Sequence, residues 1–173
     1  AAMYLAAAGV GTIALADGDT VDLTNLQRQI LHAPDSIGQP KVESGRATLA
    51  RLNPESRVEA LNGRLEGDAL DAEVARADVV LDCSDNFATR HAVNRCCVKH
   101  RKPLVSGAAI RFDAQLAVFD LRQPDSPCYA CLFPPEATFE ETRCATMGVF
   151  APLVGIIGTV QAAEALKLLA GVG

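Results

Sequence analysis

Short apolar runs alternate with helical stretches along this chain, and the alternation limits its fold more than any other feature. Strands are predicted at residues 12–17, 57–61, 78–85, 103–110 and 115–121, and helices at 1–8, 41–52, 67–77, 86–101 and 149–169. Strands joined by helices of ten or more residues form βαβ units with parallel strands. The pattern therefore predicts an α/β fold with a Rossmann-like, mostly parallel sheet covered by helices on both faces.

Length and composition exclude several classes of protein. A chain of 173 residues is expected to form a single domain over 1–173. Its net charge of -5, without a Lys/Arg cluster, argues against nucleic acid as the main partner. The apolar stretch 149–169 is long enough to span a membrane, but Gln161, Glu164 and Lys167 are predicted to share one polar helix face, which favours a partly buried helix and no membrane span. Six irregularly spaced cysteines favour a reducing, cytoplasmic location.

Polar residues follow three of the predicted strands. Ligands of such sheets bind beyond the carboxyl ends of the strands, so residues 17–19, 82–86 and 106–109 are expected to converge. Asp17 stands where an acid would bind a nucleotide ribose, about 20 residues after a glycine-rich turn. That turn and its strand would precede Ala1, so the chain is expected to begin inside the first helix and to lack the phosphate loop. Asp17 could equally be a strand-end turn residue.

Charged and amide side chains after the first and third strands suit phosphate and magnesium. Asn25 and Arg28 lie in "TNLQRQ", and Lys41 begins the helix 41–52. An arginine fork and a lysine ammonium bind phosphate oxygens, although either can be a solvated surface cation. Asp85, which closes the buried strand 78–85, could hold Mg²⁺ against phosphate oxygens, or it could support an N-cap at Asn86.

Two cysteine features carry further chemistry. Cys128 and Cys131, in "SPCYACLFPP", supply half of a tetrahedral zinc site in a loop whose prolines argue against regular structure. A zinc-binding loop appended to the sheet is therefore expected. Cys144, in a polar segment beside Arg143, could act as a nucleophile or be an incidental exposed thiol.

Many blocks, among them "LADGD", "TNLQRQ", "GQPKVES", "VVLDCSDN", "PLVSGAAI", "PCYACLFP" and the segment 148–171, resemble the ThiF/MoeB/HesA family, relatives of ubiquitin-activating enzymes. The resemblance runs from Ala1 to the end. It implies an ATP-binding adenylation domain. Such a domain adenylates the C-terminal glycine of a ubiquitin-like sulfur-carrier protein ending in Gly-Gly with Mg-ATP, and so activates it for sulfur transfer in thiamin or molybdopterin cofactor biosynthesis.

The resemblance also implies roles for individual residues. Asp17 would contact the ribose of ATP, Asn25, Arg28 and Lys41 the phosphates, and Asp85 the magnesium. Cys144 matches a loop cysteine that in some relatives forms a covalent link with the activated carrier or a sulfur donor protein, and in MoeB-type members adenylation does not require it. The family's second Cys-x-x-Cys is expected beyond Gly173, and a homodimer is expected.

Two other functional classes are open to such a sequence. The βαβ start and Asp17 would also serve an NAD-dependent oxidoreductase, and Cys128 with Cys131 would permit a non-enzymatic, zinc-stabilised interaction module. Hydride transfer has no use for the phosphate and magnesium residues, and an interaction module leaves the polar strand ends unexplained. "ARADVVLDCSDNFATR" resembles ThiF members and "PLVSGAAIR" resembles MoeB members, so both pathways stay open.

Overall fold

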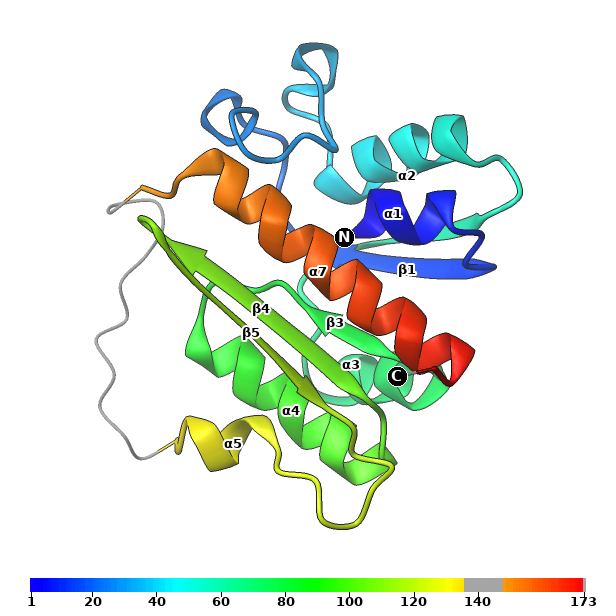
Figure 1. Cartoon of the computed structure of the whole chain (residues 1–173). Helices are drawn as coiled ribbons and strands as arrows, with labels where there is room; N and C mark the ends of the chain where they lie inside the picture. The colour runs from blue at the N-terminus through cyan, green and yellow to red at the C-terminus, as the bar shows by residue number, and fades with distance from the viewer. Residues whose placement is uncertain (136–147, 173) are drawn as a thin grey trace. The chain divides into compact units, whose positions relative to one another are not determined.

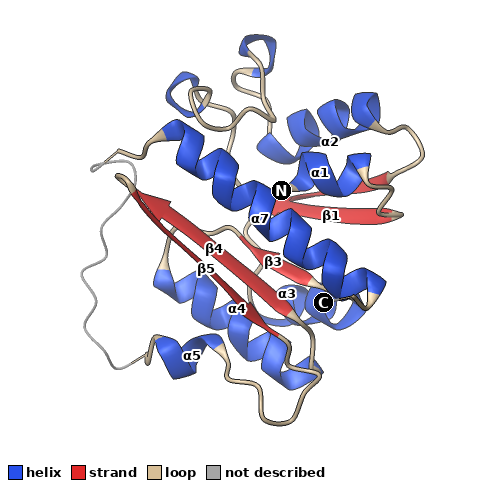
Figure 2. Ribbon diagram, in the orientation of Figure 1, coloured by secondary structure: helices blue, strands red, loops and turns tan. Residues whose placement is uncertain are grey.

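The computed structural model describes residues 1–135 and 148–172. They belong to two compact units, Ala1–Leu65 and Glu66–Gly173. Figure 1 labels the helices and strands, and Figure 2 shows that both units combine the two kinds of element. The α/β class predicted from the alternation is confirmed.

The first unit is built on two parallel strands. Its elements are α1 (Ala2–Ala7), β1 (Thr12–Asp17), the 3-10 turns η1 (Leu23–Asn25) and η2 (Pro34–Ser36), α2 (Lys41–Leu52) and β2 (Arg57–Asn62). Strand β1 pairs with β2 in parallel register, from Thr12 opposite Arg57 to Asp17 opposite Asn62. Helix α2 contacts both strands, and α1 packs on α2 and β1. Leu5, Ile13 and Leu49 are buried between these elements.

The second unit contains a three-stranded mixed sheet. Its elements are α3 (Gly67–Arg76), β3 (Val80–Asp82), α4 (Phe87–His100), β4 (Leu104–Ile110), β5 (Asp113–Phe119), α5 (Tyr129–Leu132) and α7 (Ala151–Ala170). Strands β3 and β4 are parallel, and β5 returns antiparallel to β4. Helix α7 contacts all three strands, while α4 contacts β3, α3 and α5. Figure 1 shows α7 in front of this sheet and α3 and α4 behind it.

Three local predictions need correction. Strand β3 covers only Val80–Asp82, because the residues after Asp82 leave the ladder for a hydrogen-bonded turn. Strand β5 covers Asp113–Phe119, so it begins and ends two residues earlier than the predicted 115–121. The shift arises because β5 forms a tight hairpin with β4. In the proline-rich loop, Tyr129–Leu132 form one helical turn, and the prolines lie outside it.

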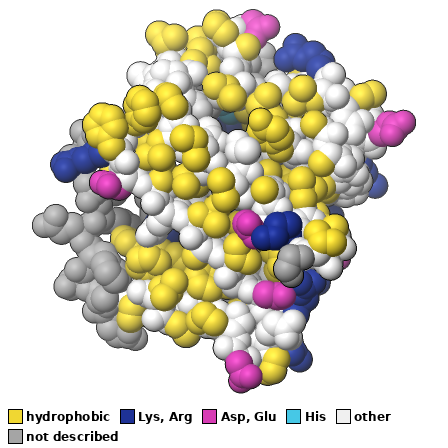
Figure 3. Space-filling view, viewed as in Figure 1, with side chains coloured by type: hydrophobic (Ala, Val, Ile, Leu, Met, Phe, Trp, Pro, Cys, Tyr) yellow, Lys and Arg dark blue, Asp and Glu magenta, His cyan; other side chains and the backbone are white. Residues whose placement is uncertain are grey.

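Helix α7 is the one element in the described part of the chain that is long and apolar enough to cross a membrane by length and composition. It packs against the sheet, with Gln161, Ala162 and Ala165 buried there. Gln161 therefore does not lie on an exposed polar face with Glu164 and Lys167, as the spacing suggested. Figure 3 shows hydrophobic side chains over α7, and Ile156, Val160 and Leu169 of this helix are exposed.

Candidate active site

The turn after β1 gathers two carboxylates around one lysine. The Lys41 ammonium lies 2.7 Å from Asp19 Oδ2 and 3.7 Å from Asp17 Oδ2. The amide of Asp19 donates to Asp17 Oδ1 at 2.8 Å, which fixes the turn. Gly18 allows a close approach of two backbone segments, because a Cβ there would lie 3.1 Å from the amide nitrogen of Arg64, closer than most Cβ contacts. The structure therefore brings Asp17 and Lys41 together, as expected for two parts of one site.

Lys41 occupies an electrostatically unfavourable place for a cation. It is the first residue of α2, where the aligned backbone dipoles of the helix already create positive potential. Its side chain is only 12% exposed, and Asp17 and Asp19 offset the repulsion. A lysine at a helix N-terminus is well suited to phosphate oxygens, because the ammonium and the helix attract the same anion.

Asn25 and Arg28 lie in the loop between β1 and α2. Asn25 ends the turn η1, and its carbonyl accepts hydrogen bonds from the amides of Arg28 and Gln29. The Arg28 guanidinium donates to the carbonyl of Thr24 at 3.2 Å, which uses one of its five donor hydrogens. Both residues belong to the unit that contains Asp17 and Lys41.

His32 lies in the same unit, and no role was predicted for it. Its Nδ1 is 2.9 Å from the hydroxyl of Ser44, which is buried on α2. Burial and the nearby charge of Lys41 hold the pKa of His32 below its ordinary value, against a smaller opposite effect of Asp17. His32 was missed because its partners lie 9 to 15 residues away in the sequence and only the fold brings them near.

This lowered pKa predicts a pH dependence of stability. As the pH falls below about 6.5, the unfolded chain binds a proton at His32 before the folded chain does, so the free energy of unfolding decreases until the folded pKa is reached. Replacing His32 with Gln should remove up to about 1.4 kcal/mol per pH unit from the slope in this window. Urea titrations at pH 7.5 and 5.5 measure the slope.

The matched control is His91→Gln, which removes an imidazole of the second unit and leaves the His32–Ser44 contact in place. It should keep the wild-type slope. A His32→Gln variant with an unchanged slope would contradict the assignment.

In the second unit, the segment after β3 is held by hydrogen bonds at successive residues. The Asp82 carboxylate is buried and accepts from the amide of Ser84 at 2.9 Å. Arg90 donates to the carbonyl of Ser84 from Nε at 3.2 Å and from Nη2 at 2.8 Å. Asn86 caps α4 by accepting from the amide of Thr89 at 2.9 Å, as predicted. These contacts fix the backbone on both sides of Asp85.

Asp85 is exposed, and its carboxylate makes no hydrogen bond or ion pair to the residues that the structure describes. The end of the neighbouring strand lies beside this segment, because Asp82 is paired with Ser106 and the Ser106 hydroxyl is 3.5 Å from Asp82 Oδ2. The prediction that residues 82–86 lie near residues 106–109 is therefore confirmed for Asp82 and Ser106, the first residues of the two segments. The further convergence with Asp17, Arg28 and Lys41, which belong to the other unit, stays a prediction.

Cys128 is the residue just before the helical turn α5, and Cys131 lies within that turn. Their sulfur atoms are 3.7 Å apart, and two thiolates bound to one tetrahedral zinc ion at about 2.3 Å lie about 3.8 Å apart. The amide of Cys128 donates to the sulfur of Cys131 at 3.5 Å. The pair therefore has the spacing of two zinc ligands. In the described ranges, 1–135 and 148–172, no group of three or more His, Cys, Asp or Glu residues could hold a metal ion.

The structure adds Asn94 to this pair. Asn94 is buried on α4, donates from Nδ2 to the sulfur of Cys128 at 3.5 Å, and accepts from the amide of Tyr129 at 2.9 Å. Burial alone would raise the pKa of the Cys128 thiol, but the hydrogen bonds from Asn94 and the turn outweigh burial and lower it. Sequence reasoning missed Asn94, since a polar residue within a helix usually faces solvent.

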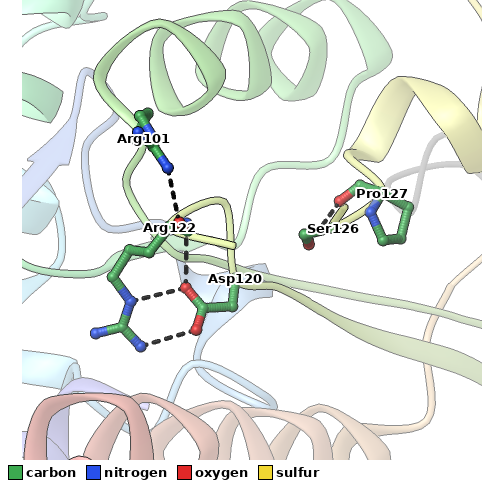
Figure 4. A network of polar contacts seen from close by, with 5 residues as sticks. All are labelled: Arg101, Asp120, Arg122, Ser126 and Pro127. Atoms are coloured by element: carbon green, nitrogen blue, oxygen red, sulfur yellow. Dashed lines mark hydrogen bonds and ion pairs between the residues drawn. The ribbon is translucent and has the colours of Figure 1, made fainter. Parts of the chain in front are cut away.

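A second set of polar contacts anchors the chain that leads to Cys128 (Figure 4). Arg122 forms a two-point ion pair with Asp120, at 2.7 and 2.9 Å, and Arg101 at the end of α4 donates to the carbonyl of Arg122 at 2.9 Å. The hydrogen bonds from Arg122 hold the pKa of Asp120 below its ordinary value. Helix α4 thus fixes the loop at two points, through Arg101 and through Asn94. Cys144 lies outside the described residues.

Comparison with known proteins defines the family of this α/β chain. Residues 1–173 match the ThiF family, so the chain belongs to it, and the resemblance recognised in the sequence is confirmed. The molybdopterin-synthase adenylyltransferase of Escherichia coli is 50% identical over 175 residues, covering 100% of this chain and 69% of that protein. The E. coli sulfur carrier protein ThiS adenylyltransferase is also 50% identical, covering 99% of this chain and 68% of that protein.

Solved structures agree on the fold. A crystal structure of E. coli MccB with MccA-N7isoASN gives a TM-score of 0.79 at 24% identity, and one of MccB with ATP gives 0.77 at 24% identity. Each covers 96% of this chain, whereas this chain spans only 51% and 50% of those MccB chains.

Proposed function

We propose that the protein is an adenylyltransferase that activates the C-terminal glycine of a ubiquitin-like sulfur-carrier protein with ATP. The observation that carries the proposal is the 50% identity, over essentially the whole chain, to two adenylyltransferases named for sulfur-transfer pathways. The chain is equally identical to both relatives, so we assign its substrate only as a class, a carrier protein ending in Gly-Gly. The pathway is thiamin or molybdopterin cofactor biosynthesis. An NAD-dependent oxidoreductase and a non-enzymatic module are not favoured, because these relatives are adenylyltransferases.

The reaction needs positioning and charge neutralisation more than proton transfer. The carrier's terminal carboxylate, ionised at neutral pH, attacks the α-phosphorus of ATP, and the bond to the bridging oxygen of the leaving pyrophosphate breaks. In this proposal Asp17 binds the ribose, and Asn25, Arg28 and Lys41 bind phosphate oxygens. The exposed Asp85 would hold Mg²⁺, which neutralises charge on the departing pyrophosphate.

The remaining assignments extend the proposal. Zinc is a structural ion bound by Cys128, Cys131 and two further thiolates, and the 3.7 Å sulfur separation supports it. Cys144 acts in a covalent sulfur step with a donor protein and is dispensable for adenylation. The protein works as a cytoplasmic homodimer, and the exposed apolar side chains of α7 are available for a subunit contact.

An exchange assay tests the activity. The intact protein should exchange labelled pyrophosphate into ATP only when Mg²⁺ and a carrier ending in Gly-Gly are both present. A carrier lacking its last glycine is the matched control, because it keeps the folded carrier but its terminal carboxylate ends one residue short of the α-phosphorus. Exchange that proceeds equally well without a carrier would refute a carrier-activating function.

A further inference from the structure

Gln161 is a buried amide on the otherwise apolar inner side of α7. It is 3% exposed, and its neighbours on that side are Ala162 and Ala165. Its Nε2 donates to the carbonyl of Asp82 at 3.1 Å and to the carbonyl of Val105 at 3.2 Å. Its Oε1 accepts from the thiol of Cys83 at 3.5 Å. Both amide hydrogens and the oxygen therefore have partners.

These partners lie at the base of the loop that carries Asp85. Asp82 is the last residue of β3, Cys83 is the first residue after it, and Val105 is on the neighbouring strand β4. One side chain thus ties the end of β3 to β4 and holds the first residue of the loop. The rest of the loop is held by the Ser84, Arg90 and Asn86 contacts described above.

Gly107 provides the space for this amide. A Cβ at position 107 would lie 2.4 Å from Cδ of Gln161 and 2.7 Å from both Nε2 and Oε1. Real side chains do not approach so closely, so any other residue at 107 would displace Gln161 from the two carbonyls. The small residue on β4 and the amide on α7 are therefore complementary.

Packing alone does not explain an amide at position 161. A leucine of similar size would fill the space against the sheet without desolvating a polar group, whereas a buried amide is tolerated only when its partners are in place. A fully bonded buried network makes the groups around it rigid. Here the rigid groups are the backbone of Asp82 and the side chain of Cys83, two to three residues before the carboxylate of Asp85.

We propose that Gln161 is a positioning residue for Asp85, with Gly107 providing its space. The amide fixes the carboxyl end of β3, so that the Asp85 carboxylate is held in one place before magnesium and nucleotide bind. The inference rests on the proposed function for the role of Asp85, but the geometry of the loop can be tested independently of activity.

Two readouts on the intact protein test the proposal. Gln161→Leu keeps the size of the side chain and removes its hydrogen bonds, so the amides of residues 83–86 should exchange with deuterium at least about tenfold faster in the ligand-free protein. The Mg²⁺ concentration for half-maximal pyrophosphate exchange should rise about 10- to 100-fold, with a smaller change in rate at saturating Mg²⁺.

A core variant separates positioning from loss of stability. Val74 is buried on α3 and is not a partner in the hydrogen bonds of the loop described above, so Val74→Ala should weaken the second unit and leave both readouts at the wild-type value. Equal shifts in Val74→Ala and Gln161→Leu would overturn the proposal, as would wild-type deuterium exchange of 83–86 in Gln161→Leu. If the wild-type protein shows no pyrophosphate exchange, the proposed function fails. Deuterium exchange of residues 83–86 then still decides whether Gln161 holds the loop in place.

A double-mutant cycle tests whether Gly107 on β4 acts through the Gln161 amide. Gly107→Ala should displace Gln161 and reproduce the faster exchange of 83–86. In the Gln161→Ala background the extra methyl group enters vacated space, so Gly107→Ala should add little further change. Additive effects of the two substitutions would show that Gly107 and Gln161 act separately and would overturn the inference.

Discussion

Asp85→Ala is expected to slow carrier-dependent pyrophosphate exchange about 30- to 1000-fold, the equivalent of about 2 to 4 kcal/mol in the transition state. The reason is the loss of a charged contact to the metal that neutralises the leaving pyrophosphate. Asp85 is exposed and makes no hydrogen bond to the described residues, so its removal should leave the loop bonds of Ser84 and Asn86 intact. Initial rates at saturating ATP and Mg²⁺, with circular dichroism to check folding, measure the effect.

Asp125→Ala is the matched control, because Asp125 is also an exposed carboxylate of the second unit but lies in the loop between β5 and α5. It should exchange pyrophosphate at the wild-type rate. An Asp85→Ala protein that is folded and nearly as active as wild type would remove Asp85 from the site.

The order and type of the main elements were predictable because their boundaries carry chemical signals. Helix α2 and strand β1 occupy the predicted residues 41–52 and 12–17. Pro40 precedes the helix and Asn53-Pro54 ends it, while Gly11 and Asp17 bound the strand. The adjacency of the β3 and β4 ends also followed from the sequence, because parallel strands joined by a helix place their carboxyl ends at one edge.

Contacts between distant elements were not predictable from local pattern. Asn94 and Gln161 read as polar interruptions of helices, and solvent is the usual environment of such residues. Their actual partners, Cys128 and Asp82, lie 34 and 79 residues away in the chain. The short β3 was missed for a related reason, since an apolar run shows burial but not where the backbone leaves the ladder.

The second large effect is expected at the cysteine pair, where Cys128→Ser should lower the zinc affinity of the intact protein about 100- to 1000-fold. Structural zinc in small domains contributes about 10 to 16 kcal/mol over four ligands, so one thiolate accounts for about a quarter of that free energy. The 3.7 Å separation of the two sulfur atoms matches one tetrahedral ion, which makes each thiolate a full ligand. Competition with a chromophoric chelator measures the affinity, and metal analysis after dialysis gives the stoichiometry.

Two substitutions on α4 complete this experiment. Asn94→Ala removes the donor to Cys128 and the acceptor of the Tyr129 amide but leaves both thiolates, so its zinc affinity should fall about 10- to 100-fold, less than for Cys128→Ser. Cys96→Ser changes a cysteine two residues from Asn94 on the same helix, which is not a partner in the hydrogen bonds of the Cys128–Cys131 pair given above, and this variant should bind zinc as wild type does. The order of affinities therefore distinguishes a thiolate ligand, a residue that orients it and a bystander thiol. Loss of zinc in Cys96→Ser, or undiminished affinity in Cys128→Ser, would assign the metal to other residues.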